Sequence, residues 1–143
     1  MLIAHVLRGK GAVVHTLTAD ATLEQAAKEL NLRKVGALVV VNERGALLGV
    51  LSERDIVREV SKRGAACLAD RVHAAMSRDV ITARPDETID DGLARMTDRR
   101  IRHLPVLEEG RLAGIVSIGD LVKHRIMAVE AEAAAMQAYI SAQ

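Results

Sequence analysis

One long internal repeat limits the possible folds of this 143-residue chain more than any other feature. Residues 39–55 read VVVNERGALLGVLSERD, and residues 105–120 read PVLEEGRLAGIVSIGD. Three residues recur 65 positions later: Gly49 as Gly114, Ser52 as Ser117, and Asp55 as Asp120. Upstream the displacement is 66, because the turn of the first copy is one residue longer. Two copies at this period indicate two homologous subdomains, since a solenoid needs three or more short units.

Each copy shows the same order of elements. A short apolar strand comes first, and a helix follows it. Two apolar strands then flank a glycine-containing turn, and a second helix begins after a serine. The predicted strands are residues 13–17, 37–41 and 47–51 in the first copy and residues 80–82, 104–107 and 112–116 in the second. The order β-α-β-β-α is therefore predicted twice.

Capping patterns and glycines mark where these elements begin and end. A Ser or Thr followed three residues later by Asp or Gln is the signature of a helix N-terminus. The pairs are Thr22 with Gln25, Ser52 with Asp55, Thr88 with Asp91, and Ser117 with Asp120. Gly45 and Gly110 mark the two hairpin turns.

A linking segment and a long tail complete the chain. Within the linker, residues 64–77, a short helix over residues 72–76 parallels residues 3–7. The last helix is predicted to continue to about Ile140, with apolar residues spaced for one stripe: Leu121, Val122, Ile126, Val129, Ala133, Met136 and Ile140. We expect repeat 1 with its lead-in at residues 1–65, repeat 2 at 66–125 and a helical extension at 126–143.

These elements predict a mixed α+β fold. A single β-α-β-β-α unit of this size cannot bury the face of its own sheet. Two units related by a pseudo-twofold axis can cover each other. Half of the residues are hydrophobic, but only 1% are aromatic, so the core must consist of aliphatic side chains and methionine.

Composition argues against several classes of function. The net charge of +1 and the near absence of aromatic side chains disfavour nucleic-acid binding and an anionic membrane surface. The single cysteine, Cys67, excludes an internal disulfide and a multi-cysteine metal site. We find no secretory signal and no apolar run long enough to span a membrane, which predicts a cytoplasmic protein.

Catalytic motifs are also missing. The five histidines show no metal-binding spacing, and the serines lie in no nucleophile elbow or phosphate-binding glycine loop. We found no pair of carboxylates spaced for acid–base catalysis. We therefore expect a protein that is not an enzyme and requires no metal.

The repeated motif resembles that of the CBS-domain family, as a tandem pair (Bateman module) of the stand-alone bacterial type. Residues 49–55 (GVLSERD) and 114–120 (GIVSIGD) match the family pattern of Gly, two mostly apolar residues, Ser or Thr, two variable residues and Asp. Residues 101–106 (IRHLPV) resemble the family's entry into the next strand. The resemblance implies a disc-like module with two clefts between the sheets, which commonly bind AMP, ADP, ATP or another adenosyl compound.

The resemblance also implies which residues contact the ligand. The motif serine contacts phosphate or ribose, and the aspartate accepts hydrogen bonds from the ribose hydroxyls. By position, these are Ser52 and Asp55 in one cleft and Ser117 and Asp120 in the other. A helix N-terminus is suited to phosphate, and an ionised Asp is a pure acceptor suited to a diol. The alternative interpretation is that both pairs only cap their helices.

Basic residues make the second cleft the stronger candidate for phosphate. Arg102 and His103 occupy positions where some family members direct basic side chains at phosphate, whereas the first copy has Gly36 and Ala37 there. Arg54 is a further candidate to reach phosphate. We expect unequal clefts, and the alternative interpretation of the basic residues is a solvated stripe on the surface.

Apolar strand edges are expected to hold the adenine. The candidates are Ile81, Thr82, Ala83, Leu104 and Pro105, and ordinary core packing is the alternative for them. Because no aromatic side chain is available to stack on the base, we expect modest affinity.

Two functional hypotheses follow. The first is a regulatory module that binds AMP, ADP, ATP or NAD(H), senses energy or redox state, and acts on an unidentified effector protein. The second is a structural or protein-interaction module with empty clefts, in which the tail helix, with Glu130 and Glu132 among alanines, pairs with another chain. A homodimer is expected in either case.

Overall fold

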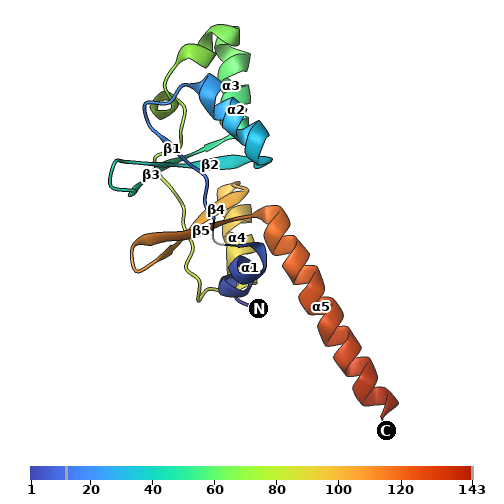
Figure 1. The fold of residues 1–143 in the computed structure, drawn as a ribbon. Coiled ribbons are helices and arrows are strands. Elements are labelled where there is room, and N and C mark those ends of the chain that lie inside the picture. Colours follow the sequence, from blue (N-terminus) through green and yellow to red (C-terminus); the bar gives the residue numbers. More distant parts are fainter. Residues whose placement is uncertain (12, 143) are drawn as a thin grey trace. The chain divides into compact units, whose positions relative to one another are not determined.

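A computed structural model describes residues 1–11 and 13–142, and it has the mixed α+β fold predicted from the sequence (Figure 1). The elements before the middle of the chain are α1 (Ile3–Lys10), β1 (Thr16–Thr18), α2 (Leu23–Arg33), β2 (Ala37–Val41), β3 (Leu47–Ser52) and α3 (Glu53–Arg63). Two 3₁₀ helices follow, η1 (Gly64–Ala69) and η2 (Val72–Ala74). The remaining elements are α4 (Ile89–Arg99), β4 (His103–Glu108), β5 (Arg111–Ser117) and α5 (Ile118–Ser141).

The chain forms two compact units. Residues 13–81 make up the first-repeat unit, and residues 1–12 with 82–143 make up the second-repeat unit. The units and the sequence repeats are different divisions of the chain. Helix α1, which precedes the first repeat, packs in the second-repeat unit, and the linker with η1 and η2 packs in the first-repeat unit.

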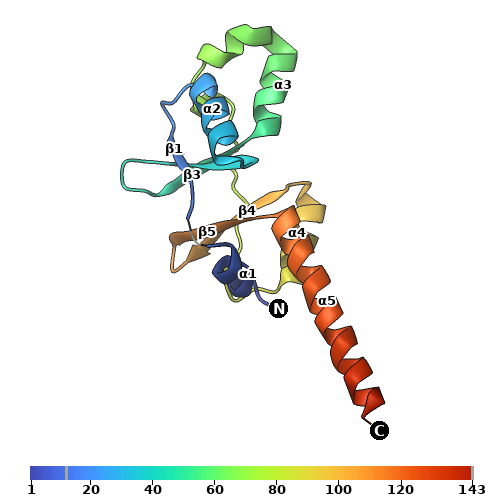
Figure 2. The ribbon, with the colours of Figure 1, turned by 45° about the vertical axis from the view of Figure 1, so that its right-hand side comes forward.

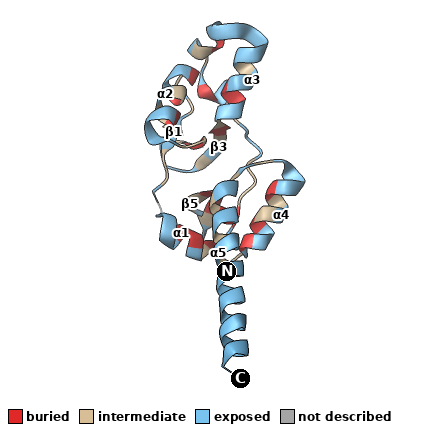
Figure 3. Cartoon of the chain, turned by 90° about the vertical axis from the view of Figure 1, so that its right-hand side faces the viewer, coloured by how far each residue is buried: buried red, intermediate tan, exposed pale blue. Residues whose placement is uncertain are grey.

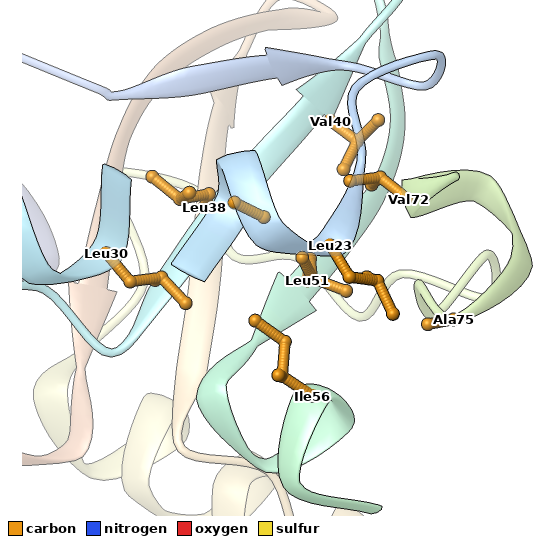
Figure 4. Close-up of a cluster of buried hydrophobic side chains, with 9 residues drawn as sticks. Leu23, Leu30, Leu38, Val40, Leu51, Ile56, Val72 and Ala75 are labelled. Carbon is orange, nitrogen blue, oxygen red and sulfur yellow. The ribbon is translucent and has the colours of Figure 1, made fainter. Parts of the chain in front are cut away.

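The first-repeat unit contains a three-stranded sheet in the order β1-β2-β3. Strand β1 runs parallel to β2, and β2 runs antiparallel to β3. Helices α2 and α3 lie on the same side of this sheet, where their apolar side chains meet those of β2 and β3 (Figures 1 and 4). The cluster consists of Leu23, Ala26, Leu30, Leu38, Val40, Leu51, Ile56, Val72 and Ala75. Its members are aliphatic, as the composition requires.

The second-repeat unit contains the antiparallel hairpin β4-β5. Its paired residues run from His103 opposite Ser117 to Glu108 opposite Arg111. Glu109 and Gly110 both have positive φ and form its two-residue turn. The first copy instead uses a longer turn, in which the side chain of Asn42 accepts the N–H groups of Arg44 and Ala46. This difference accounts for the change in repeat displacement.

The first strand of each repeat starts later than predicted. In the first copy the strand covers Thr16–Thr18 rather than residues 13–17. In the second copy residues 80–82 form no strand, and a single parallel bridge joins Ala83 to Val106. Because Pro85 has no N–H group, it cannot extend this ladder. Positional equivalence between the copies is kept, since Ala83 matches Leu17 at the displacement of 66.

The two lead-in segments pack in equivalent ways within their units. Ile3 and Val6 of α1 are fully buried, and α1 lies against β5 and the first turns of α5 (Figures 1 and 2). Val72 and Ala75 are buried at the matching positions of the other unit, 69 residues later. Glycines permit both contacts: a Cβ on Gly114 would lie 2.6 Å from Leu7, and a Cβ on Gly49 would lie 2.6 Å from the carbonyl of Ser77.

All four predicted capping boxes are present, with both hydrogen bonds of each pair. Helices α2 and α4 both end on a residue in the left-handed region, Lys34 and Arg100, which satisfies the last carbonyls of the helix. The predicted long helix is also present. Only Leu121 of its 24 residues is buried, and the C-terminal part is exposed (Figure 3).

Candidate functional site

The start of α5 carries the motif residues of the second repeat. The Ser117 Oγ accepts the N–H of Asp120 at 3.1 Å, and the Asp120 carboxylate accepts the N–H of Ser117 at 2.9 Å. Ser117 and Asp120 therefore cap α5. The cap does not conflict with ligand binding, because a carboxylate has about four acceptor positions and the cap uses one of them.

Strand pairing brings the other predicted residues of the second repeat to the same place. His103 lies opposite Ser117 in the hairpin, and the carbonyl of Arg102 accepts the N–H of Ile118 at 2.8 Å. The carbonyl of Pro105 accepts the N–H of Ala83 at 2.9 Å. The structure therefore places Ala83 and residues 102–105 beside the start of α5.

These residues differ in exposure. Ala83, Leu104 and Pro105 are buried, so core packing accounts for much of their environment. Thr82 and His103 are half-buried, and Arg102 is exposed. Arg102 is thus the most accessible of the predicted residues in the second-repeat unit.

The motif residues of the first repeat form a similar cap. Ser52 Oγ accepts the N–H of Asp55, and the Asp55 carboxylate accepts the N–H of Ser52 at 2.8 Å. Asp55 is only 7% exposed and also binds the guanidinium of Arg58 at 2.8 Å, whereas Arg54 is exposed. The predicted adenine-wall residue Ile81 belongs to this unit, whereas its neighbour Thr82 belongs to the other.

Lys10, which no sequence motif singles out, forms an ion pair with Asp120. Its ammonium lies 2.5 Å from Oδ2 of Asp120, and both side chains are about one-third exposed. Burial alone raises the pKa of Asp120, but the hydrogen bonds from Lys10 and Ser117 and the charge of Lys10 outweigh it. The pKa of Asp120 therefore lies below its ordinary value, and the carboxylate is ionised at neutral pH.

The Lys10 contact has no equivalent in the first repeat. At the displacement of 69 that relates the two lead-in segments, the residue matching Lys10 is Asp79. Asp55 obtains its cation from Arg58, three residues along its own helix. The two motif aspartates are thus neutralised in different ways, which supports a functional difference between the repeats.

An ion pair between Arg95 and Glu87 fixes the segment that precedes α4. Arg95 donates to both carboxylate oxygens of Glu87 and to the carbonyl of Thr82, the last at 2.9 Å. The hydrogen bonds from Arg95 lower the pKa of Glu87, and the hydrogen bonds to Glu87 raise the pKa of Arg95. This pair was also missed, and it fixes the backbone at a predicted adenine-wall residue.

One cavity lies elsewhere, between α2 and α3 of the first-repeat unit. It has a volume of about 540 Å³, and its lining includes Lys34, Gly36 and Glu53 but not Ser52, Arg54 or Asp55.

Within residues 1–11 and 13–142, no group of three or more His, Cys, Asp or Glu side chains is placed to hold a metal ion. No helix in the same ranges has the length and apolarity needed to cross a membrane.

Comparison with known proteins identifies the family. The CBS domain model matches residues 12–62 and 70–126. A CBS-domain containing protein from Agrobacterium tumefaciens has a solved structure that is 42% identical, with a TM-score of 0.86, covering 87% of this chain and 99% of that one. A mitochondrial CBS domain-containing protein of Arabidopsis thaliana is 34% identical over 146 residues, which is 96% of this chain and 71% of the relative.

Another similar structure was solved with ligands. It is a CBS domain pair in complex with 5′-methylthioadenosine and S-adenosyl-L-methionine, 26% identical, with a TM-score of 0.78, covering 91% of this chain and 98% of that one. Some relatives are enzymes, such as a homoserine O-acetyltransferase of Methanococcoides burtonii, of which this chain covers 21% at 36% identity. With two matches to the domain model in tandem, the chain belongs to the CBS domain family as a CBS-pair regulatory module.

Proposed function

We propose that this CBS pair binds an adenosine-containing nucleotide at the second-repeat site, formed by Arg102, His103, Ser117, Asp120 and Lys10. The support from outside the chain is the CBS pair solved with two adenosyl compounds. The support from the chain is the convergence of the motif residues with a basic strand entry and a lysine.

The observation that carries the proposal is the Lys10–Asp120 pair. Asp120 is ionised and anchored by its own helix, so it presents acceptor positions of the kind that a ribose diol requires. Lys10 places a positive charge beside the helix N-terminus, where anions are already favoured. The site therefore combines acceptors for hydroxyl groups with cationic groups for phosphate.

We further propose that the second-repeat site binds more tightly than the first. In the first repeat Asp55 is nearly buried and bound by Arg58, and Gly36 and Ala37 stand where the second repeat has Arg102 and His103. The ligands that fit are AMP, ADP, ATP and NAD(H), each of which carries both a ribose and phosphate. We expect binding to regulate an effector protein from a cytoplasmic homodimer, with no catalytic step and no metal.

Thermal unfolding with a panel of ligands tests the proposal. The panel is AMP, ADP, ATP, NAD, NADH and S-adenosylmethionine, with GMP as the control for the base. A ligand that binds only the folded state stabilises it by about 2.7 kcal/mol at a hundred times its dissociation constant, which raises the midpoint by several degrees. We expect a shift with at least one adenosyl nucleotide and none with GMP.

A pair of variants locates the binding. Asp120→Ala removes the proposed ribose acceptor and the carboxylate that accepts the N–H of Ser117, whereas Asp91→Ala removes the equivalent carboxylate acceptor for Thr88 at the start of α4, away from the site. Each is expected to cost about 1 kcal/mol of stability through the lost cap. Only Asp120→Ala should abolish the ligand-induced shift. Equal shifts in both variants would exclude the second-repeat site, and no shift in the wild type would favour the alternative, a structural interaction module.

A further inference from the structure

Six residues of α5 form an apolar stripe that nothing in the described chain covers. We call it the α5 seam: Val122, Ile126, Val129, Ala133, Met136 and Ile140. All six are exposed, and the five large ones retain between 41% and 65% of their accessible surface. Their spacing alternates strictly between four and three residues. That is the pattern of the core positions of a coiled coil, in which helices pair along one narrow stripe.

The opposite side of α5 packs on its own unit. Leu121 is fully buried and lies where a Cβ on Gly92 would meet it, at 2.9 Å. His124 and Ala128 are half-buried, three and seven residues further along. At about 100° per residue, Leu121, His124 and Ala128 lie more than a quarter turn from the centre of the seam. The seam is thus turned away from the unit that carries it, and α5 extends beyond that unit (Figures 1 and 3).

Charged residues flank the seam with opposite signs at its two halves. Lys123 and Arg125 lie beside its first half, and Glu130 and Glu132 lie beside its second half. In coiled-coil terms all four occupy the positions that border the core. Arg125 and Glu130 are five residues apart, which is the separation at which flanking residues meet across two parallel helices in register.

We propose that two copies of this chain pair through the α5 seam as a parallel coiled coil. Every seam residue then meets its own counterpart. Arg125, whose Nε lies 3.2 Å from Oδ1 of Asp90 in its own chain, comes within reach of Glu130 of the other copy. Ile126 and Ile140 fall on the core position where β-branched residues favour parallel dimers. The proposal concerns α5 alone and does not depend on the proposed nucleotide site.

An antiparallel pair fits the seam less well. Matching its opposite charges would align Ile126 with Val129 of the second copy and Val122 with Ala133. Met136 and Ile140 would then lie beyond the overlap and stay exposed to water. A parallel pair covers the seam along its whole length. This stabilises the exposed end of α5, because short isolated helices are marginal in water.

The oligomeric state tests the pairing, with a matched control on the same turn. Ile126→Glu places a charge in the seam, whereas Met127→Glu places the same charge beside it at a similarly exposed position (53% and 48%). By analytical ultracentrifugation, the wild type and Met127→Glu should have twice the 15.4 kDa mass of one chain, and Ile126→Glu should have half the mass of the wild type. A monomeric wild type, or an Ile126→Glu variant with unchanged mass, would overturn the proposal.

Cysteine crosslinking tests the orientation. Ala133→Cys faces its own counterpart in a parallel pair and should form a disulfide between copies, whereas Ala134→Cys, outside the seam, should not. The native Cys67 is buried and serves as the background in both variants. Crosslinking only in the double variant Val122→Cys/Ala133→Cys would show an antiparallel pair and overturn the parallel one.

Pairing through the α5 seam can be tested independently of nucleotide binding. Ile126→Glu should keep the ligand-induced thermal shift of the wild type, because Ile126 lies outside the second-repeat site. Vesicle binding by a monomeric chain, or a monomer captured by a different protein through the seam, would reassign the seam to that partner.

Discussion

At the residue scale, Asp120 has two tasks. It caps α5 through Ser117, as many aspartates cap helices, and it also meets Lys10 from a segment 110 residues away. The local pattern predicts the cap, and the cap alone is compatible with a purely structural aspartate. The contact with Lys10 distinguishes Asp120 from a purely structural aspartate, because a cation at this place has no role in capping.

Lys10 should therefore discriminate between ligands with and without phosphate. Lys10→Met keeps most of the aliphatic side chain and removes the charge. We expect the variant to bind AMP several-fold more weakly and adenosine unchanged, because adenosine lacks the anion that Lys10 attracts. Isothermal titration of both ligands measures this.

A matched control accompanies it. Lys28→Met changes the net charge equally, at an exposed ion pair with Glu24 in the first-repeat unit. It should alter neither affinity. Equal weakening of AMP and adenosine by Lys10→Met would mean that Lys10 only supports the fold.

The Glu87–Arg95 pair predicts a dependence of stability on pH. Because the pKa of Glu87 is lower in the folded chain than its ordinary value of 4.5, its contribution is complete above about pH 4.5 and is lost as the pH falls through the folded pKa. Glu87→Gln removes the charge. The midpoint difference between wild type and variant should be constant near pH 7 and shrink below about pH 4.5. Thermal unfolding across this range checks it, and a difference that does not shrink as the pH falls below about 4.5 would contradict the assignment.

At the scale of elements, each lead-in segment is fixed to a hairpin through a glycine. The contact at Gly49 is made with backbone, since Ser77 and Val50 exchange two hydrogen bonds of 3.0 Å. The contact at Gly114 is made with the end of the Leu7 side chain. Adding a side chain at the motif glycine should therefore affect stability differently at Gly49 and at Gly114.

Gly49→Ala should destabilise the protein more than Gly114→Ala. The added methyl would lie 2.6 Å from a hydrogen-bonded carbonyl in the first case and 2.6 Å from a rotatable side chain in the second. Overpacking of this kind costs about 1–3 kcal/mol, and we expect Gly49→Ala near the upper end. Chemical denaturation of both variants measures the difference. A larger cost at Gly114 would show that Leu7 cannot move aside.

At the scale of the whole molecule, the two compact units do not coincide with the two repeats. Each unit takes its lead-in segment from before the other repeat in the sequence. A change in a lead-in segment should therefore act on a unit that is remote in sequence.

Amide hydrogen exchange can detect that each unit contains the lead-in segment that precedes the other repeat. Ile3→Ala empties a fully buried position and should cost about 2–5 kcal/mol. In the Ile3→Ala variant, amide hydrogen exchange should accelerate in residues 82–121. In the Val72→Ala variant, at the matching position, it should accelerate in residues 13–81. Ile3→Ala acting first on residues 13–61 would contradict the division into units.

The sequence by itself determined everything that local periodicity controls. Capping pairs such as Thr22 with Gln25, the hairpin turn at Gly110, and the length of α5 each depend on residues within a few positions of one another. The element order also predicts the strand pairing that places Ala83 and residues 102–105 near Ser117.

Only the tertiary structure decided which segments distant in sequence meet. No local pattern places Lys10 on Asp120 or assigns α1 to the second-repeat unit. Packing also divided the predicted apolar stripe of α5, turning Leu121 inward and leaving Val122 outward. The first strand of the second repeat is reduced to the bridge at Ala83, and Pro85, which lacks an N–H donor, prevents the ladder from continuing beyond it. These outcomes depend on contacts between segments that are distant in sequence. The packing and electrostatic energies that favour them arise only when those segments are in contact.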